Sequence, residues 1–400
     1  MKKLLLFGAG KIGRSFIGPL FSQGGYEVIF VDIQKEIIGQ INQRRSYQVI
    51  IKSDMGDQIQ EIKNVRGLHV SQKNDIINEI VDTELMASAV GPSNLSSVIR
   101  IVAEGLKIKF DKSETSSVDI ILAENLRNAA EFFFLGLKDY LPERIIRNRI
   151  GLVETSIGKM VPIMSKEDIR QDILLVFAEP YNTLILDRKG FKNPLPPVRE
   201  LAPKTNMKAW VDRKSFIHNL GHAAAAYFGY LKHPDQPYLY QVLDDEEVYD
   251  FSKSVMNESA KILTSLYPSE FTMKSLEEHI IDLLQRFRNK SLGDTVHRVG
   301  RDLFRKLGPE DRLAGAIHLA LKTGNSYNEI LYALICGFYF GALDEDGKLF
   351  PPDEAFRKFF EKDKIESTLV KVCKFNKIDH SEVFDRAKDI SRRIRKKFNF

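Results

Sequence analysis

Three side chains just past the middle of the sequence have the types needed to take a proton from an alcohol. Lys214, Asn219 and His222 stand in a K-x4-N-x2-H spacing. At about 100° per residue, a helix would place His222 roughly 80° and Asn219 roughly 140° around from Lys214. An amine can act as the base, an amide can donate to the oxygen, and an imidazole can position either group. The alternative is a solvated lysine and a packed histidine.

The residues around these three predict the helix that would carry them. Apolar Phe216, Ile217 and Leu220, followed by the alanines 223–226, recur with helical spacing after Arg213. The same helix would place His218 and His222 four residues apart, the spacing of a zinc-binding pair, but no third ligand is evident. We therefore expect proton-transfer chemistry on one broad helical face and no metal.

The N-terminal stretch has the order of elements that binds a dinucleotide. An apolar strand at 4–7 precedes a glycine-rich loop, a helical pattern follows to about residue 21, and a second strand covers 28–31. The first glycine permits a tight turn, the second admits a pyrophosphate, and the third lets helix and strand pack closely. The loop residues predicted to bind the cofactor are Gly8, Ala9, Gly10, Lys11, Ile12 and Gly13.

Asp32 closes the second strand, 19 residues after Gly13. At this position a carboxylate can accept hydrogen bonds from the adenosine ribose and would repel a 2′-phosphate, which predicts NAD over NADP. The alternative is a glycine turn in an α/β protein that binds no cofactor.

Two further predicted strands, 85–90 and 118–122, end in residues that suit a ligand site. The first ends in Ala89-Val90-Gly91-Pro92 and the second in Ala123-Glu124-Asn125. Ligands of doubly wound sheets meet the carboxyl ends of strands, so Val90, Gly91 and Pro92 are predicted beside the cofactor. Asn125 is either a donor to a substrate oxygen or the cap of a helix beginning near Leu126.

A basic cluster lies in the last third of the chain. Arg298, Arg301 and Arg305 stand at i, i+3 and i+7, next to Lys306, and a helix would gather the three guanidinium groups on one face. Such a face could bind a substrate phosphate. The alternative is a solvated face paired with nearby acids. Those acids are Asp302, Glu310 and Asp311.

Length and pattern together predict an α/β protein of two domains. A chain of 400 residues exceeds one ordinary core. Strand and helix patterns alternate up to the proline-rich stretch 194–203, and helical periodicity dominates beyond it. We expect a Rossmann-type doubly wound domain over residues 1–200 and a mostly α-helical domain over 201–400.

Composition narrows the function class. The chain has a hydrophobic content of 43% and a charged content of 28%, which are typical of a soluble globular protein. Its net charge of +5 does not by itself indicate nucleic-acid binding. Cys336 and Cys373 lie in apolar surroundings, where buried thiols are expected. No run of residues is apolar enough for a membrane span. The basic tail 392–397 is interpreted as a solvated helix. We expect a cytoplasmic monomer or weak dimer.

With these pieces in place, nearly the whole chain resembles the polyol-specific long-chain dehydrogenases. The ordered series of motifs is far more specific than any one of them. The segments that carry it are 7–18, Arg45-Ser-Tyr-Gln-Val49, Ala89–Pro92, Ala123–Asn125, Arg213–Lys214 with Asn219–Ala223, Arg298–Arg301, Arg305–Leu307 and Asp311–Leu313.

The resemblance implies a metal-independent hydride transfer with NAD, in which mannitol 1-phosphate and fructose 6-phosphate are interconverted. Carried over residue by residue, the family's catalytic lysine falls on Lys214, its asparagines on Asn125 and Asn219, and its histidine on His222. These residues would supply the base, the donors to the developing alkoxide, and a positioning group.

The chain also departs from the family pattern. It reads Ile157-Gly-Lys-Met-Val-Pro162 where family members have Val-Asp-Arg-Ile-Val-Pro, and it has Leu303 where a proline is usual and His218 where an apolar residue is usual. The identity of the polyol therefore stays open. Mannitol itself, a hexonate, or a dinucleotide-binding sensor without turnover are the alternatives.

Overall fold

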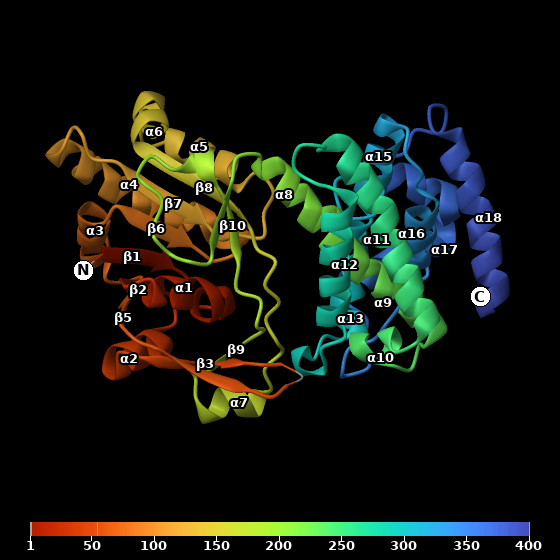
Figure 1. The fold of residues 1–400 in the computed structure, drawn as a ribbon, viewed down its shortest axis with the longest axis horizontal. Helices are drawn as coiled ribbons and strands as arrows, with labels where there is room; N and C mark the ends of the chain where they lie inside the picture. Colours follow the sequence, from red (N-terminus) through yellow and green to blue (C-terminus); the bar gives the residue numbers. More distant parts are fainter. Residues whose placement is uncertain (1, 54, 400) are drawn as a thin grey trace. The chain divides into compact units, whose positions relative to one another are not determined.

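The chain divides into two compact units, Met1–Val211 and Asp212–Phe400. The computed structural model describes residues 2–53 and 55–399. The first unit holds the strands and the second is helical, as the red-to-yellow and green-to-blue segments of Figure 1 show. The division falls later than residue 200 because the strand Leu201–Lys204 and most of the helix Met207–Arg213 belong to the first unit.

The main sheet of the first unit has eight strands in the order β11-β10-β8-β7-β6-β1-β2-β5. The strands β5-β2-β1-β6-β7-β8 are parallel and follow the 3-2-1-4-5-6 order of the dinucleotide-binding fold. β10 pairs antiparallel with β8 and parallel with β11. Their bounds are β1 Lys2–Phe7, β2 Tyr26–Asp32, β5 Val65–His69, β6 Leu85–Ser88, β7 Val118–Leu122, β8 Ile150–Ser156, β10 Leu184–Asp187 and β11 Leu201–Lys204.

A second, three-stranded sheet in the order β4-β3-β9 completes the strands of this unit. Its bounds are β3 Tyr47–Ile51, β4 Gln58–Ile62 and β9 Val176–Ala178. The helices are α1 Gly18–Gln23, α2 Lys35–Arg44, α3 Lys73–Asp82, α4 Leu95–Lys112, α5 Ala129–Lys138, α6 Glu143–Arg149, α7 Lys166–Gln171 and α8 Met207–Arg213. Short helical turns are the π-helical η1 Gly13–Ile17 and the 3-10 helices η2 Pro92–Asn94 and η3 Arg188–Gly190.

The main sheet is buried on both faces, which explains why its strands read as continuous apolar runs. Leu4 and Leu6 of β1 point into one core, whereas Leu5 and Phe7 point into the other. A strand covered by helices on both sides needs apolar residues at consecutive positions, because successive side chains face opposite ways. The prediction of a doubly wound N-terminal domain is confirmed.

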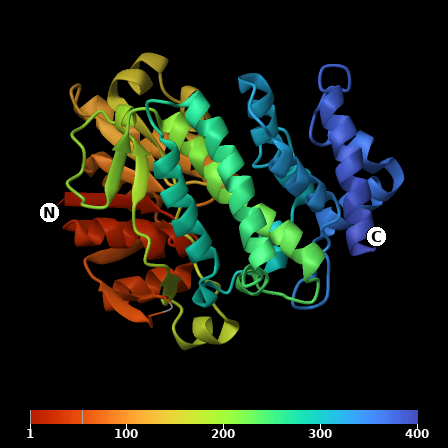
Figure 2. The same ribbon diagram turned by 45° about the vertical axis from the view of Figure 1, so that its right-hand side comes forward.

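The described part of the second unit, residues 212–399, is built from helices. α9 packs against α11 and α16, and α11 also packs against α12, as the side-by-side helices of Figure 2 show. The bounds are α9 Leu220–Lys232, α10 Leu239–Leu243, α11 Glu246–Leu266, α12 Met273–Phe287, α13 Val296–Gly300, α14 Leu303–Lys306, α15 Ala314–Thr323, α16 Asn328–Phe338, α17 Pro351–Lys371 and α18 Ser381–Phe398, with η4 Lys214–Asn219 and η5 Lys290–Leu292. Among the described residues, no helix is both long and apolar enough to cross a bilayer.

Candidate active site

The glycine loop has the geometry that its spacing predicted. Gly8 adopts a φ of +102°, and a Cβ there would lie 2.5 Å from the carbonyl oxygen of Ala89. A Cβ on Gly13 would lie 2.0 Å from the Gly8 carbonyl oxygen, whereas a Cβ on Gly10 would meet no atom within 4 Å. The first and third glycines thus allow close packing, and the second leaves the backbone open to a ligand. Lys11 is exposed, Ile12 is half-buried, and Ala9 is buried.

Asp32 lies at the carboxyl end of β2 and is half-buried. Its Oδ2 accepts a hydrogen bond from the Ala9 N–H at 2.7 Å, and its Oδ1 accepts one from the Gln34 N–H at 2.9 Å. Each carboxylate oxygen has two lone pairs, so both can accept a further hydrogen bond from a ribose. Asp32 therefore holds the glycine loop as well as facing the predicted adenosine site.

A cavity of about 650 Å³ opens where the strand order of the main sheet reverses, between β1 and β6. Doubly wound sheets bind their ligands at this switch point. Of the predicted cofactor residues, Gly8, Gly10, Asp32 and Val90 line the cavity. Gly91, with a φ of +85°, and Pro92 continue from Val90 into η2. The volume is in the range that suits a small-molecule ligand.

Glu124 holds the loop after β6 in place, a role that the sequence analysis did not assign. Its side chain is buried, and Oε1 accepts hydrogen bonds from the Ser88 hydroxyl at 2.8 Å and the Val90 N–H at 2.9 Å. Its Oε2 accepts one from the Gly91 N–H at 2.9 Å. A carboxylate directly after a buried strand was the available signal, since such a group requires partners.

Asn125 follows Glu124 and is exposed in the first unit. The helix that follows begins at Ala129 with Asn128 as its N-cap residue, at a φ of 57°. The expectation of a helix beginning near Leu126, with Asn125 as its cap, is therefore wrong. Two residues separate Asn125 from that cap, so its side chain remains a candidate for ligand binding.

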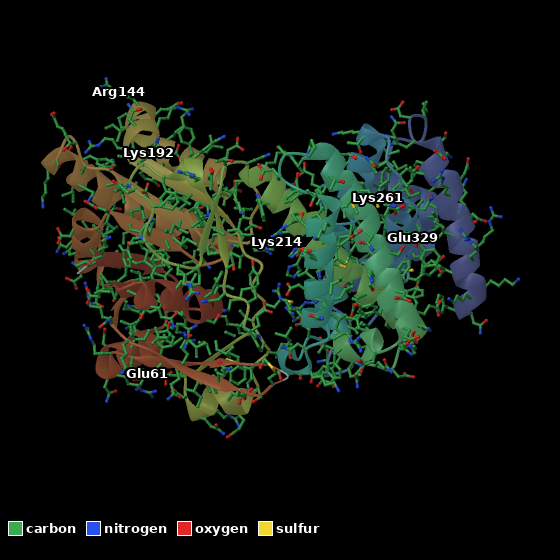
Figure 3. The ribbon with its side chains drawn as sticks, viewed as in Figure 1. Glu61, Arg144, Lys192, Lys214, Lys261 and Glu329 are labelled. Atoms are coloured by element: carbon green, nitrogen blue, oxygen red, sulfur yellow. The ribbon has the colours of Figure 1, made fainter. Side chains whose placement is uncertain are left out.

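Lys214, Asn219 and His222 belong to the second unit and lie on one helical segment, where Lys214 is labelled in Figure 3. Lys214–Asn219 forms the π-helical turn η4 between α8 and α9. A π turn pairs residues i and i+5, so Asn219 follows Lys214 by one turn of this wider helix. The expected angle of roughly 140° between them, which assumed α-helical geometry, is corrected by this turn. Five residues of a π-helix make about one turn, a geometry that places the two side chains on the same side of the helix.

The environment of Lys214 favours a neutral amine. Burial lowers the pKa of Lys214 to about 8, and the positive charge of Arg312 acts in the same direction. Arg312 is buried, donates through its Nε to Asp311 at 2.7 Å, and has its guanidinium 3.5 Å from the Asn219 carbonyl oxygen. A lysine with a pKa near neutral pH can alternate between the free amine and the ammonium.

His222 is held by an aromatic stack. Its ring lies parallel to Phe287 of α12, with centroids 4.4 Å apart and planes 9° apart, and the His218 ring meets it edge-on at 6.0 Å. Burial, followed by the positive charges of Arg298 and Arg312, lowers the pKa of His222 well below its ordinary value. Its imidazole is therefore neutral at physiological pH.

The expected single face of arginines is wrong, because the helix breaks between them. α13 ends at Gly300, Arg301 is its C-cap with an extended ψ of 162°, and Asp302 adopts a left-handed φ of 77° before α14 begins. Asp353, 51 residues further on, accepts hydrogen bonds from the Asp302 and Leu303 N–H groups and so stabilises the break. This contact is distant in sequence and could not be seen in the local spacing.

The four basic side chains have separate surroundings. Arg305 pairs with Asp302 and, at 3.1 Å, with Asp311, which matches the solvated alternative. Arg298 pairs with Asp294, and Arg301 lies over the Phe350 ring at 5.1 Å. Lys306 is buried and donates to the Val299 carbonyl oxygen at 2.6 Å. Burial and the charges of Arg312 and Arg305 lower the pKa of Lys306 to about 6.

The departure at 157–162 lies just after β8, at the carboxyl edge of the main sheet. Lys159 is buried, donates to the Asn182 Oδ1 at 2.9 Å, and lies over the Phe16 ring at 5.2 Å. The Tyr181 ring covers Gly158, where a Cβ would lie 3.5 Å from it. The segment therefore presents a buried lysine and a tyrosine ring in place of an aspartate and an arginine.

Family models cover almost the entire chain. The model described as mannitol dehydrogenase Rossmann domain matches residues 2–200, and the one described as mannitol dehydrogenase C-terminal domain matches residues 206–392. The chain is 31% identical over 349 residues to the mannitol-1-phosphate 5-dehydrogenase of Lactococcus lactis subsp. cremoris, covering 86% of this chain and 88% of the relative. It is 28% identical to the enzyme of that name from Buchnera aphidicola, covering 93% and 94%.

Solved structures share the fold at low identity. A substrate-free D-sorbitol dehydrogenase aligns with a TM-score of 0.81 and 16% identity, over 98% of this chain and 93% of that chain. The mannitol 2-dehydrogenase of Pseudomonas fluorescens, in ternary complex with NAD and D-mannitol, aligns with a TM-score of 0.74 and 13% identity, over 98% and 92%. Each of the two units thus has a counterpart in the family models, and the whole fold has counterparts among solved polyol dehydrogenases.

Proposed function

Because the chain belongs to the mannitol dehydrogenase family of NAD-dependent polyol oxidoreductases, we propose that it interconverts mannitol 1-phosphate and fructose 6-phosphate with Lys214 as the general acid and base. The observation that supports this most directly is Lys214 itself, whose pKa is lowered to about 8 by burial. It stands one π-helical turn before Asn219. The chemistry requires a base that is neutral and a nearby donor to the oxygen that gains charge.

The protein's part in the reaction is to move one proton and to stabilise one oxygen. In polyol oxidation the free amine of Lys214 takes the hydroxyl proton while the amide group of Asn219 donates a hydrogen bond to the developing alkoxide, a role that the resemblance also assigns to Asn125. In the reverse direction the Lys214 ammonium returns the proton to the carbonyl oxygen. His222, neutral and fixed against Phe287, positions the neighbouring hydroxyl. Bound NAD supplies the hydride acceptor, and its reduced form supplies the hydride donor.

The first unit supports NAD as the cofactor. The backbone at Gly10 is open to a pyrophosphate, and the Asp32 carboxylate retains acceptor capacity beside the cavity. Ala9, Lys11, Ile12 and Gly13 complete the loop, whose backbone begins the helix that faces the cofactor phosphates. Val90, Gly91 and Pro92 are proposed to border the nicotinamide side.

We propose that Arg301 is the main ligand of the substrate phosphate, with Arg298 and then Lys306 as further candidates. Arg301 is exposed, and no ion pair is described for it among residues 2–53 and 55–399. Arg305 is the weakest of the four candidates, since two carboxylates already neutralise it. A guanidinium without a carboxylate partner is the better phosphate ligand, because it has no competing anion.

A turnover panel tests the proposed function. Absorbance of NADH would be followed with fructose 6-phosphate, fructose, mannitol 1-phosphate, mannitol and hexonates as substrates, using the unmodified protein and Lys214→Ala. We expect the phosphorylated pair to have the highest kcat/KM. A higher kcat/KM for free mannitol or a hexonate would favour another polyol dehydrogenase of the family, and NADH binding without turnover of any substrate would indicate a sensor.

We propose a cellular compartment from the cysteines and, separately, an oligomeric state for the protein. Cys336 and Cys373 are both buried free thiols, as expected from the sequence, and unpaired cysteines suit a reducing compartment such as the cytoplasm. We propose a monomer or weak dimer, which analytical ultracentrifugation at two protein concentrations would test. A stable tetramer at low concentration would contradict it.

A further inference from the structure

Two buried polar atoms of the second unit face each other, and neither has a hydrogen-bond partner among the described residues. They are Nε2 of His222 and Oδ2 of Asp294, which lie 3.4 Å apart. Asp294 is only 5% exposed. A buried carboxylate oxygen and a buried imidazole nitrogen each lose the hydrogen bonds that water would provide, so an unformed contact between them is costly.

Other contacts fix both groups in this arrangement. The second carboxylate oxygen of Asp294, Oδ1, accepts a hydrogen bond from the Arg298 guanidinium, and the Asp294 carbonyl oxygen accepts one from the Leu239 N–H at 2.8 Å. The His222 ring is held parallel to Phe287. With Oδ1 occupied by Arg298, Oδ2 is the oxygen left for His222.

We propose that Asp294 is the positioning residue for His222: its Oδ2 accepts the Nε2–H of the imidazole, which leaves the lone pair of Nδ1 to accept a hydrogen bond from a substrate hydroxyl. This inference rests on the proposed function, in which His222 contacts the substrate. It adds a second residue and a specified tautomer to that role.

The protonation state of His222 makes the tautomer decisive. A neutral imidazole carries a single N–H, on either Nε2 or Nδ1, and the partner of one nitrogen determines the role of the other. Burial lowers the pKa of His222 well below its ordinary value, so the ring stays neutral. The distance of 3.4 Å exceeds the usual 2.7–3.2 Å of an N–H···O hydrogen bond. Such contacts commonly tighten when the substrate binds.

Nuclear magnetic resonance of histidine-labelled protein reads the tautomer directly. Long-range correlations between the ring protons and the two ring nitrogens distinguish the protonated nitrogen from the one with a lone pair. The His222 signals, among those of eight histidines, are assigned by their loss in His222→Gln. We expect Nε2 to carry the proton at pH 8. A proton on Nδ1 in the unmodified protein would overturn the proposal, whatever the variants do.

Asp294→Asn reverses the polarity of the contact with little change of shape. Arg298 requires an acceptor, so the Asn oxygen should face Arg298 and the amide N–H should face His222. The proton of His222 should then move to Nδ1, where it can no longer accept from the substrate. We expect kcat/KM for the polyol to fall by about 10-fold or more, the effect of one misdirected hydrogen bond, with NADH affinity and the pH dependence from Lys214 retained.

A matched control is available in the same unit. His233 and Asp245 form another pair, with Nε2 and Oδ2 2.8 Å apart, outside the candidate site. Asp245→Asn should leave the His222 tautomer and kcat/KM unchanged. An Asp294→Asn protein whose His222 tautomer does not change would assign Asp294 a merely structural role. Normal turnover in Lys214→Ala would instead refute the proposed function and leave the tautomer measurement standing.

Discussion

At the scale of single residues, the lowered pKa of Lys214 carries the proposed chemistry. The amine must be free to accept the alcohol proton, so polyol oxidation should rise with pH through about 8 and then reach a plateau. Carbonyl reduction should be favoured below that pH, where the ammonium can donate. The measurement is kcat/KM against pH in both directions. Two profiles that are flat between pH 6 and 10 would contradict the assignment.

Lys214→Ala should lower kcat by roughly 10²–10⁴, the usual contribution of general acid–base catalysis. NADH binding should persist, since the proposed cofactor residues belong to the first unit. The matched control is Lys261→Ala, which removes an exposed lysine of α11, labelled in Figure 3. If both variants turned over normally, Lys214 would be a structural lysine.

Asp32 should determine the choice between the two nicotinamide cofactors. Its carboxylate can accept from the ribose hydroxyls of NAD and would repel the 2′-phosphate of NADP. We expect a preference of at least ~1–2 kcal/mol for NADH over NADPH, the scale of one charged hydrogen bond. Asp32→Ala should reduce that preference and also loosen the glycine loop, because Oδ2 accepts from the Ala9 N–H. Equal kcat/KM for both cofactors in the unmodified protein would argue against this role.

At the scale of elements, Glu124 joins the ends of β6 and β7. A Glu124→Gln side chain would direct an amide N–H group at one of the donors that the carboxylate now accepts from, Ser88, Val90 or Gly91. We expect a loss of roughly 1–3 kcal/mol of unfolding free energy and weaker NADH binding, measured by thermal melting and fluorescence titration. Glu36→Gln, on the exposed side of α2, is the control. Unchanged NADH affinity would limit Glu124 to a role in stability.

The break between α13 and α14 separates two arginines that the sequence placed together. Arg301→Ala should raise KM for fructose 6-phosphate by at least about 10-fold while leaving KM for NADH unchanged, because it removes a charged phosphate contact. Arg305→Ala removes the same charge from a guanidinium that two carboxylates already hold, so it should have a much smaller effect. Equal effects of the two substitutions on KM would contradict the assignment of the phosphate to Arg301.

The parts of the fold that the sequence predicted are those fixed by local pattern. Strand β1, the glycine loop and Asp32 were all evident, because their residue types are required by the backbone itself. The small sheet β4-β3-β9 was missed, in part because β9 pairs with β3 from more than a hundred residues away in the sequence. The left-handed Asp302 was missed for the same reason, since Asp353 stabilises it. The approach of Asp294 to His222 was missed because the two residues lie 72 positions apart in the sequence.

At the scale of the whole molecule, the lowered pKa values of two buried lysines predict how the free energy of unfolding depends on pH. The folded-state pKa of Lys306 is about 6 and that of Lys214 is about 8, whereas an unfolded lysine titrates near ~10.4. Between those values the unfolded chain binds more protons than the folded chain. Unfolding free energy should therefore rise with pH from about 6 to about 10, by at most about 1.4 kcal/mol per pH unit for each group.

Thermal melting across that pH range provides the measurement. Lys306→Met replaces a titrating side chain by an uncharged one of similar length, so it should flatten this slope. Lys261→Met, at an exposed site, should not. A melting temperature that falls between pH 6 and pH 9 in the unmodified protein would contradict the lowered pKa values.

The π turn at Lys214–Asn219 makes the helix around it tolerant of one particular change in length. A π turn contains one residue more than an α-helical turn, so deletion of a single residue such as Ser215 would let the segment relax into an α-helix. Asn219 would then follow Lys214 by four residues, which is about one α-helical turn, so the residues after the deletion would keep nearly their present faces. The alanine-rich face of α9 would stay against α11 and α16, and His222 would stay beside Phe287. Deletion of a residue within α9 itself, where the helix holds no extra residue, would instead rotate every later residue by about 100° and turn that face away from its partners.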